Sequence, residues 1–558
     1  MHSSKTSAQL LFAAFKKADI RDIIVSPGSR NAPLIIESLA AGYRPEVIVD
    51  ERSAGFTGLG MAQQTHRPAV LICTSGTAVL NYYPAVAEAF YARIPLIVVS
   101  ADRPPYRIDK GEGQTIRQDG VLEKHTHYSV TLHLEEAVSE NSKLIKEAIE
   151  MAFLKQGPVH INIPFEEPLY RQVAEPVKFE PAIRTVEEDR PVSEQTLDEV
   201  EKIWKKAGRK LIIVSQLPPG EMLNEQLRRL ALFDDVVILT ENIGNVKDPL
   251  FLEHIDRLIF PFNEHTWQEY APDLVITIGN NIISKKIKYL LRQQKPAYGH
   301  WHIGKTPIQP DTFDVLRYKF DTSPEMFLSQ LLFRIYDWQP ASEYKVLWHN
   351  LAEKRRKAHR KYMKELSFGD MKLFDILADT IHSPYQIQWG NSTVVRYAQL
   401  FDFAKGITHY SNRGTSGIDG TVSTAVGAAK RTTDKVLLVT GDLAFRYDSN
   451  ALWQNFPENL KIIVIYNGGG DIFNFIPGPS TVDRYKEYFV AASLADPDVL
   501  KVISGFQPEI LRTESVEEAR AQIEDFLSNP HSRLLLVNSA AVNNAEILKN
   551  YFDFLISE

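Results

Sequence analysis

The chain has 558 residues, enough for about three or four domains of ordinary size. Hydrophobic residues make up 44% and charged residues 24%, which is a usual globular composition, and the net charge of −7 with no basic block argues against a nucleic-acid partner. The single cysteine, Cys73, lies in an apolar run, so we exclude an intramolecular disulfide and expect a buried thiol in a cytoplasmic protein. No apolar run approaches the length of a membrane span or a signal peptide, so we expect a soluble, unexported protein.

The first third of the chain alternates short β-branched runs with longer amphipathic stretches. This is the pattern of βα units on a parallel sheet. The segment 164–191 is rich in Pro and Glu and lacks periodicity, so we predict a linker there. The predicted strands of this part are 22–26, 46–49, 69–73, 96–100 and 159–163.

Two further β/α sets follow, and the charged run 351–366 separates them. We interpret that run as a solvated helix face rather than a binding patch. The central set lacks a Gly-x-Gly-x-x-Gly fingerprint, so a bound dinucleotide is not supported. The predicted strands are 210–215, 236–239, 274–278 and 297–303 in the central set, and 386–389, 407–410, 436–440, 462–466 and 534–538 in the last.

These patterns predict an α/β chain of three doubly wound domains with mainly parallel sheets. We place the domains at 1–175, 190–345 and 365–558. Ligands of such sheets bind beyond the carboxyl ends of the strands, so the residues that directly follow each strand are the candidates for function.

The ends of two consecutive predicted strands carry oxygen ligands and glycines. Strand 436–440 runs into Gly441-Asp442, and strand 462–466 runs into Asn467-Gly468-Gly469. Carboxylate and amide oxygens suit Mg²⁺, whose coordination is often completed by phosphate oxygens, and glycines let the backbone approach closely. Taken singly, the Asp is more often a helix N-cap and the Asn-Gly a turn, but the combination favours a metal site.

This pair resembles the signature of thiamine-diphosphate enzymes, in which Gly-Asp-Gly is followed after an interval by Asn-Asn. The sequence departs from that signature at Leu443 and Tyr466. The resemblance implies that Asp442, Asn467 and the carbonyl of Gly469 bind Mg²⁺ or Mn²⁺, and that Gly441 also contacts the cofactor.

The same resemblance assigns the activating carboxylate to the first domain. In these enzymes one Glu at a strand end hydrogen-bonds the aminopyrimidine ring, and a carboxyl held against an apolar surface suits this role because its pKa is raised. Glu51 is our choice over Asp50, and the structural alternative for Glu51 is a helix N-cap. The next strand end supplies Ser75 and Gly76, which the resemblance assigns to the pyrimidine-binding loop.

Four arginines stand beside small residues at predicted strand or turn ends. They are Arg30, Arg103, Arg396 and Arg413. An isolated arginine is normally a surface residue, but four at such positions suggest substrates with several carboxylates, which the guanidinium group binds in a bidentate way.

Several stretches, at 26–34, 50–62, 100–105, 114–118, 390–396 and 412–420, resemble the 2-succinyl-5-enolpyruvyl-6-hydroxy-3-cyclohexene-1-carboxylate synthase family of menaquinone biosynthesis. The resemblance implies decarboxylation of 2-oxoglutarate and 1,4-addition of the succinyl carbanion to isochorismate. It implies a homodimer or homotetramer with active sites at subunit interfaces, and Ile418 beneath the cofactor. The substrate site would comprise Ser29, Arg30, Arg103, Gln114, Lys285, Ser392, Arg396, Arg413 and Phe473.

Two details of this assignment stay open. Lys286 could take the place of Lys285, and Gly113 stands where the family often has Asn. The alternatives are another carboligase or decarboxylase of the same cofactor class, similar to acetolactate synthase, and a non-catalytic α/β scaffold protein. The first would act on small monoanionic acids, which do not require the four arginines.

Overall fold

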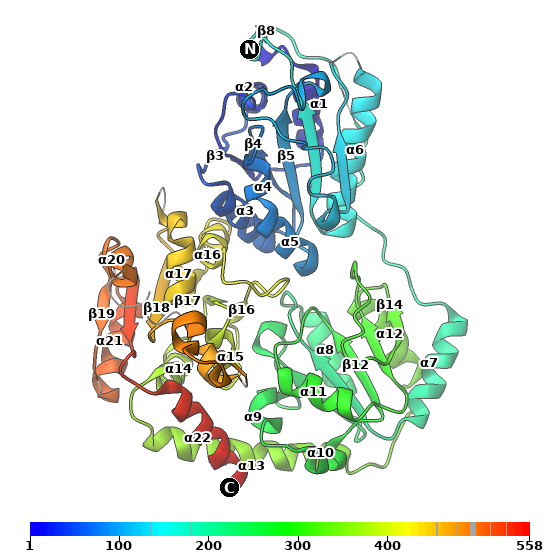
Figure 1. Cartoon of the computed structure of the whole chain (residues 1–558). Coiled ribbons are helices and arrows are strands. Elements are labelled where there is room, and N and C mark those ends of the chain that lie inside the picture. Colours follow the sequence, from blue (N-terminus) through cyan, green and yellow to red (C-terminus); the bar gives the residue numbers. More distant parts are fainter. Residues whose placement is uncertain are drawn as a thin grey trace. The chain divides into compact units, whose positions relative to one another are not determined.

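The computed structural model describes residues 1–135, 137–179, 181–453, 456–476, 478–490, 498–513, 515–531 and 533–558. The described chain forms two compact units. The first comprises Met1–Glu188, Asn412–Val436 and Tyr447–Leu460, and the second comprises Asp189–Ser411, Leu437–Arg446 and Lys461–Glu558. Three six-stranded, mainly parallel sheets with flanking helices confirm the expected α/β fold class (Figure 1).

The first unit is built on the sheet β3-β2-β4-β5-β7-β6. Its central strand β4 is buried along its whole length, because helices cover both faces. Side chains of β4 alternate between two cores, with Val70 and Ile72 packing against α1, α2 and α6, and Leu71 and Cys73 packing against α3 and α5. The strands are β2 Ile23–Val25, β3 Glu46–Val47, β4 Ala69–Cys73, β5 Leu96–Asp102, β6 Tyr128–Thr131 and β7 Val159–Pro164, and the helices are α1 Thr6–Lys17, α2 Ala32–Ala40, α3 Glu51–Thr65, α4 Ala78–Asn81, α5 Tyr83–Ala92 and α6 Val138–Lys155.

Helix α16 (Thr421–Ala429) belongs to the first unit and packs tightly along α3. A Cβ atom at Gly60 would overlap the carbonyl oxygen of Thr424, and one at Gly427 would overlap the carbonyl oxygen of Thr57. The two helix backbones therefore touch at these glycines, where no larger residue fits. This contact fixes the helix that begins with Glu51 against the segment that precedes α16.

The linker prediction for 164–191 is wrong for its first part. Phe165 and Leu169 are buried in the core beneath α1, and β8 (Gln172–Val173) pairs antiparallel with β1 (His2–Ser3). Scattered apolar anchors hold this segment, and the high Pro and Glu content hid them from the sequence pattern.

The second unit contains the central sheet β11-β10-β9-β12-β13-β14. In chain order this is 3-2-1-4-5-6, the order found in dinucleotide-binding sheets. The strands are β9 Lys210–Val214, β10 Val236–Thr240, β11 Leu252–Glu253, β12 Leu274–Ile278, β13 His300–Ile303 and β14 Leu316–Phe320, and the helices are α7 Glu194–Lys206, α8 Glu221–Leu230, α9 Ile255–Ile259, α10 Glu264–Tyr270, α11 Lys285–Gln293 and α12 Pro324–Arg334.

The third sheet has the order β16-β15-β17-β18-β20-β19. This is 2-1-3-4-6-5 in chain order, the same as in the first sheet, so the first and last sheets share a topology that the central sheet lacks. The strands are β15 Tyr385–Trp389, β16 Thr408–Tyr410, β17 Lys435–Gly441, β18 Leu460–Tyr466, β19 Glu509–Leu511 and β20 Leu534–Asn538, and the helices are α14 Asp370–Thr380, α15 Thr393–Ala398, α17 Asp442–Asp448, α18 Ile472–Phe475, α20 Asp498–Ser504, α21 Val516–Ser528 and α22 Asn544–Ser557.

Helix α13 (Tyr344–Glu365) carries the charged run between the last two sheets and packs against α22. Lys354 and Lys357 are exposed, as a solvated face requires. That interpretation is wrong for Arg355, which is buried and donates a hydrogen bond to the carbonyl oxygen of Leu555. Among the described residues, no helix is both long and apolar enough to cross a membrane.

Candidate active site

Glu51 is the first residue of α3 and follows the N-cap residue Asp50. The Oδ1 atom of Asp50 accepts a hydrogen bond of 3.1 Å from the backbone N–H of Ser53, so Asp50 and not Glu51 caps the helix. Burial, with a smaller contribution from the charge of Asp50, raises the pKa of the Glu51 carboxyl. Burial and then the charge of Glu51 raise the pKa of Cys73, which places the Glu51 carboxyl near the end of β4.

Arg103, which follows β5, gathers several candidate residues of the first unit. Its Nη1 atom donates hydrogen bonds to Ser75 Oγ and, at 2.8 Å, to the carbonyl oxygen of Gln114. The backbone N–H of Gly76 donates to Oε1 of the buried Gln118 at 2.8 Å. Both Gly76 (φ +88°), in the loop after β4, and Gln114 (φ +59°), in the loop after β5, have left-handed backbone, so both loops are held in an uncommon conformation.

Arg30 adds a second cation near Arg103. Its Nη1 atom donates to the carbonyl oxygen of Phe165 at 3.1 Å and lies 3.2 Å from Oε1 of Glu167. Burial and then the charge of Arg30 lower the pKa of Arg103, so the two guanidinium groups are close enough to repel each other. A carboxylate ligand would relieve that repulsion. Ser29 lies exposed in the turn between β2 and α2.

The segment 412–420 is fixed within the first unit by a buried carboxylate on α5. Glu88 accepts hydrogen bonds from the backbone N–H groups of Gly414 at 2.7 Å and Thr415 at 2.6 Å. Burial raises the pKa of Glu88, and these hydrogen bonds and the charge of Arg413 oppose the shift. Arg413 is buried, and Ile418 is 41% exposed.

Asp442 in the second unit follows β17 directly and is 1% exposed. Its Oδ1 atom accepts a hydrogen bond of 2.7 Å from the N–H of Leu443, and the N–H of Gly469 also bonds to this carboxyl. Its other oxygen, Oδ2, has no hydrogen-bond partner within the described part of the chain. Burial raises the pKa of Asp442 to about 7. The contact at position 443 uses only the backbone, so the departure to Leu443 leaves it intact.

Asn467 lies beside Asp442 at the end of the neighbouring strand β18. Its Nδ2 atom donates to Oδ2 of the buried Asp370 at 2.8 Å, and Ser539 Oγ donates to Oδ1 of the same carboxylate. The backbone N–H of Ser539 donates to the carbonyl oxygen of Tyr466 at 2.9 Å, so the ends of β18 and β20 meet here. Burial raises the pKa of Asp370 to about 6.

The ends of β17 and β18 fit a hard divalent cation. A buried carboxylate oxygen without a partner is rare in folded proteins, and an ion bound there would satisfy it. Gly468 and Gly469 have φ angles of +90° and +113°, which suit glycine and turn the backbone beside Asp442. The expected ligands Asp442, Asn467 and the carbonyl of Gly469 therefore lie at one sheet edge. Each of them can present an oxygen atom to a metal ion.

A cavity of about 760 Å³ in the second unit brings Arg396 and both candidate lysines together. Arg396 comes from α15, where its Nη1 atom donates to the carbonyl oxygen of Ser392 at 2.5 Å, and Lys285 and Lys286 come from α11. The apolar part of the wall includes Phe260, Tyr397, Leu400, Ile472, Phe475 and Phe552. Phe473 packs instead against Phe489, with ring centroids 5.8 Å apart.

Two cations of this cavity, Arg396 and Lys286, lie within the electrostatic influence of the half-buried Asp256 of α9. Burial lowers the pKa of Arg396 and of Lys286, and the charge of Asp256 opposes both shifts. Asp256 also accepts a hydrogen bond from Ser284 Oγ at the start of α11. Lys285 is exposed, so Lys286 is the lysine held inside this charged cluster, and the choice between them stays a prediction.

Comparison with known proteins accounts for this arrangement. Residues 5–121 match the family model "Thiamine pyrophosphate enzyme, N-terminal TPP binding domain", and residues 389–538 match the corresponding C-terminal TPP binding domain. The chain is 41% identical over 551 residues to the 2-succinyl-5-enolpyruvyl-6-hydroxy-3-cyclohexene-1-carboxylate synthase of Flavobacterium johnsoniae, with 98% of each chain covered. It is 39% identical to the synthases of Flavobacterium psychrophilum (98% of each chain) and Christiangramia forsetii (97% of each chain).

The chain belongs to this synthase family. It is therefore a thiamine-diphosphate enzyme that forms carbon–carbon bonds, and the expected cofactor class is confirmed. Glu51, Ser75 and Gly76 fall in the segment of the N-terminal domain model. Asp442 and Asn467 fall in that of the C-terminal model.

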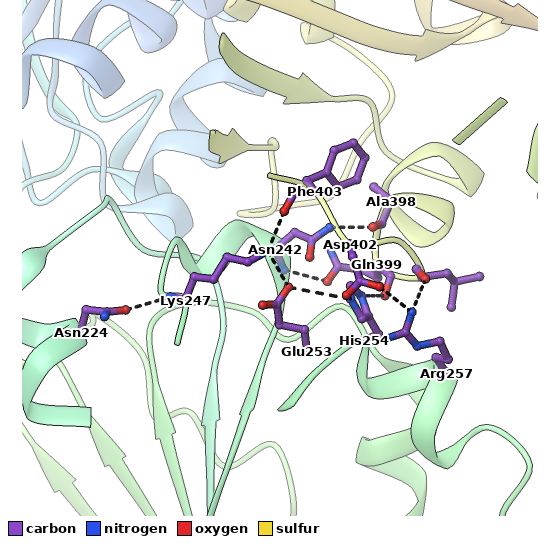
Figure 2. A network of polar contacts seen from close by, with 11 residues as sticks. Asn224, Asn242, Lys247, Glu253, His254, Arg257, Ala398, Gln399, Asp402 and Phe403 are labelled. Atoms are coloured by element: carbon purple, nitrogen blue, oxygen red, sulfur yellow. Dashed lines mark hydrogen bonds and ion pairs between the residues drawn. The ribbon is translucent and has the colours of Figure 1, made fainter. Parts of the chain in front are cut away.

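A second cluster of carboxylates in this synthase chain has a structural role (Figure 2). Glu253, His254 and Asp402 lie close enough to hold a metal ion. The two ring nitrogens of His254 lie 3.0 Å from the carbonyl oxygen of Gln399 and 2.7 Å from Asp402 Oδ1. Both ring nitrogens of His254 therefore already have hydrogen-bond partners within the protein.

Two basic side chains of the same unit pair with the carboxylates of that cluster. Arg257 Nη1 lies 3.2 Å from Asp402 Oδ2, and Lys247 Nζ lies 3.3 Å from Glu253 Oε2 and donates to the carbonyl oxygen of Phe403 at 2.6 Å (Figure 2). The network therefore joins the central sheet to the segment that follows α15, the helix that carries Arg396.

Three of the carboxylates described above were not predicted from the sequence. Asp370 and Asp256 each lie near the start of a helix, where an acidic residue is common for local reasons. The sequence does contain one indication of Glu88, because it is the single charged residue in the apolar helix Tyr83–Ala92. In all three cases the partners lie far away in the sequence, from 28 to 327 residues.

Proposed function

We propose that the chain decarboxylates 2-oxoglutarate and adds the four-carbon remainder to isochorismate in a 1,4-addition. The product would be 2-succinyl-5-enolpyruvyl-6-hydroxy-3-cyclohexene-1-carboxylate, a step in menaquinone biosynthesis. The observation that carries the proposal is the 41% identity to a synthase of that name over 98% of both chains. The buried Asp442 oxygen without a partner among the described residues, at the expected strand end, supports it independently.

The cofactor roles follow from the strand ends. Thiamine diphosphate supplies the electron sink for the decarboxylation. Asp442, Asn467 and the carbonyl of Gly469 would hold Mg²⁺ or Mn²⁺, with Gly441 against the diphosphate. Glu51 would share its proton with a ring nitrogen of the aminopyrimidine, and its raised pKa suits that exchange.

The substrate roles follow from charge. Each substrate has two carboxylates, and a partly buried cation binds a carboxylate more strongly than an exposed one. We assign Arg30, Arg103, Ser29 and Gln114 to one binding region, with Ser392, Arg396 and a lysine of α11 in another. Arg413, Ile418 and Phe473 complete the expected set of contacts.

The remaining expectations concern organisation. We propose a pyrimidine-binding domain at 1–175, a central domain at 190–345 and a diphosphate and metal domain at 365–558. A homodimer or homotetramer with active sites at subunit interfaces, in the cytoplasm, accords with the family assignment and with the buried single cysteine.

The test is turnover of isochorismate with 2-oxoglutarate, measured by the loss of isochorismate and by mass spectrometry of the product. We expect turnover only with both thiamine diphosphate and Mg²⁺. Preferential turnover of pyruvate would instead assign the chain to enzymes similar to acetolactate synthase, and no binding of the cofactor by calorimetry would favour a scaffold protein.

Glu51→Gln sharpens that test. The variant keeps the size of the side chain but cannot exchange the proton, so we expect at least about a 100-fold loss of turnover with the fold intact. Asp50→Asn is the matched control on the adjacent residue, because asparagine also caps helices and should retain most of the turnover. Wild-type turnover by Glu51→Gln would refute the role of Glu51.

A further inference from the structure

Asp370 is buried where three parts of the second unit meet. It is 1% exposed and begins α14, and its backbone N–H donates to Oδ1 of Asn544 at 2.9 Å. Its carboxylate accepts hydrogen bonds from Asn467 Nδ2, at the end of β18, and from Ser539 Oγ, after β20. The side chain therefore reaches the metal-site strand without being an expected ligand.

The contact with Asn467 decides which way its amide faces. An ionised carboxylate has only acceptors, so the atom of Asn467 that it contacts at 2.8 Å must be the NH₂ group. The amide oxygen then points to the opposite side. If the amide were rotated by half a turn, two acceptors would face each other in a buried place, which is unfavourable.

Magnesium requires the oxygen and not the NH₂ group of this amide, because the amide nitrogen has no free lone pair for a hard cation. A neutral asparagine ligand can present either group, unlike the carboxylate of Asp442. We propose that Asp370 is a positioning residue that holds the amide of Asn467 with its oxygen toward the metal site. This inference rests on the proposed function, because it assumes that Asn467 binds the metal.

The experiment is calorimetric titration of Mg²⁺ into the full-length protein at saturating thiamine diphosphate. Asp370→Leu removes the acceptor at similar volume, and we expect Mg²⁺ affinity to fall by about 10- to 100-fold, the usual effect of losing a group that orients a ligand. Asp370→Asn is the matched variant, since it is also neutral but keeps an oxygen that can accept from Asn467. We expect its affinity to stay within about threefold of wild type.

Two further variants separate orientation from general stability. Ser539→Ala removes the other hydrogen bond to the same carboxylate and should leave Mg²⁺ affinity within about threefold of wild type. In the double variant Asp370→Leu/Asn467→Asp, both side-chain oxygens at 467 can bind metal, so orientation no longer matters. Affinity should return to within about fivefold of wild type. A purely structural role predicts no such recovery.

Wild-type affinity in Asp370→Leu would overturn the inference, and so would equal losses in Asp370→Leu and Asp370→Asn, because charge alone would then explain them. If Asp370→Leu does not fold, Asp370→Ala removes the same acceptor without apolar bulk and decides the question in the same way. Failure of the wild-type protein to bind Mg²⁺ with the cofactor would instead refute the proposed function.

Discussion

Two buried carboxylates in the second unit stand directly after parallel strands but have different surroundings. Glu241 follows β10 of the central sheet and is 3% exposed. Its oxygens accept from the backbone N–H groups of Ile283 at 2.8 Å and Ser284 at 2.9 Å, and from Ser215 Oγ at 2.6 Å. Asp442 follows β17 of the third sheet, and its Oδ2 has no hydrogen-bond partner among the residues that the structure describes.

The difference separates a carboxylate that the protein itself satisfies from one that keeps an oxygen available for a ligand. Glu241 accepts from the backbone N–H groups directly before α11, where the helix dipole also favours a negative charge. Only one carboxylate oxygen of Asp442 has hydrogen-bond partners among the described residues, and burial raises the pKa of this carboxyl to about 7. A strand end is thus a candidate site when the protein's own donors leave an oxygen available.

The largest expected effect that sharpens this contrast is that of Asp442→Asn. Loss of the charged ligand should lower Mg²⁺ affinity at least about 100-fold and abolish most turnover. The cofactor-free protein should keep its stability or gain about 1 kcal/mol, because an unsatisfied buried charge is removed. Calorimetry and urea unfolding measure the two quantities, and a marked loss of stability in the cofactor-free variant would break the contrast.

Glu241→Gln should have the reverse effect of Asp442→Asn, with a loss of stability and an unchanged Mg²⁺ affinity. The new NH₂ group would face backbone donors, so the free energy of unfolding of the central region should fall by about 2–4 kcal/mol. Four of the fully buried tryptophans, Trp204, Trp267, Trp301 and Trp348, lie in or against this region and report on it by fluorescence. Protein that remains folded should bind Mg²⁺ with wild-type affinity, and a specific loss of metal binding would show that Glu241 serves the site.

The effect that is smallest near neutral pH concerns a feature that both sheets share. Burial lowers the pKa of His300 in β13 and of His409 in β16 to about 3. The unfolded chain binds protons near pH 6.5 while the native histidines stay neutral, so their contribution to stability is lost as pH falls from about 6.5 toward 3.

Each of these two histidines should cost up to about 1.4 kcal/mol per pH unit in that range. Replacement of either by Gln should flatten the dependence of unfolding free energy on pH between 6.5 and 4, measured by urea titration at several pH values. Equal flattening in both variants would show that the two sheets differ in their carboxylates and not in their buried histidines. An unchanged slope would contradict the neutral state of the native ring.

The fold was predictable wherever strands are covered on both faces. The predicted strands are all present, and those of the sheet interior, such as Ala69–Cys73 and Lys210–Val214, are apolar runs apart from Lys210. The strands that the prediction missed in the large sheets are edge strands, such as β6 and β14. They are half solvated and mix polar with apolar residues, so their composition does not separate them from loops.

The candidate site was predictable where its residues directly follow strands. Asp442, Asn467 and Arg103 carry a local signal, because chemistry-bearing residues stand at the end of an apolar run. Asp370 carries none, since its partners Asn467 and Ser539 lie 97 and 169 residues away and meet it only through the sheet order. Residues that orient other residues depend on tertiary contacts, which periodicity and spacing do not encode.

The close approach of α3 and α16 at Gly60 and Gly427 has a dynamic consequence. Backbones in direct contact leave no side chains between them that could repack, so the two helices slide or tilt only as one body. Glu51 at the start of α3 and the segment 412–420 before α16 must then move together. The hinge for any opening that admits ligands lies outside this pair, and amide exchange should be slow along both helices while it occurs.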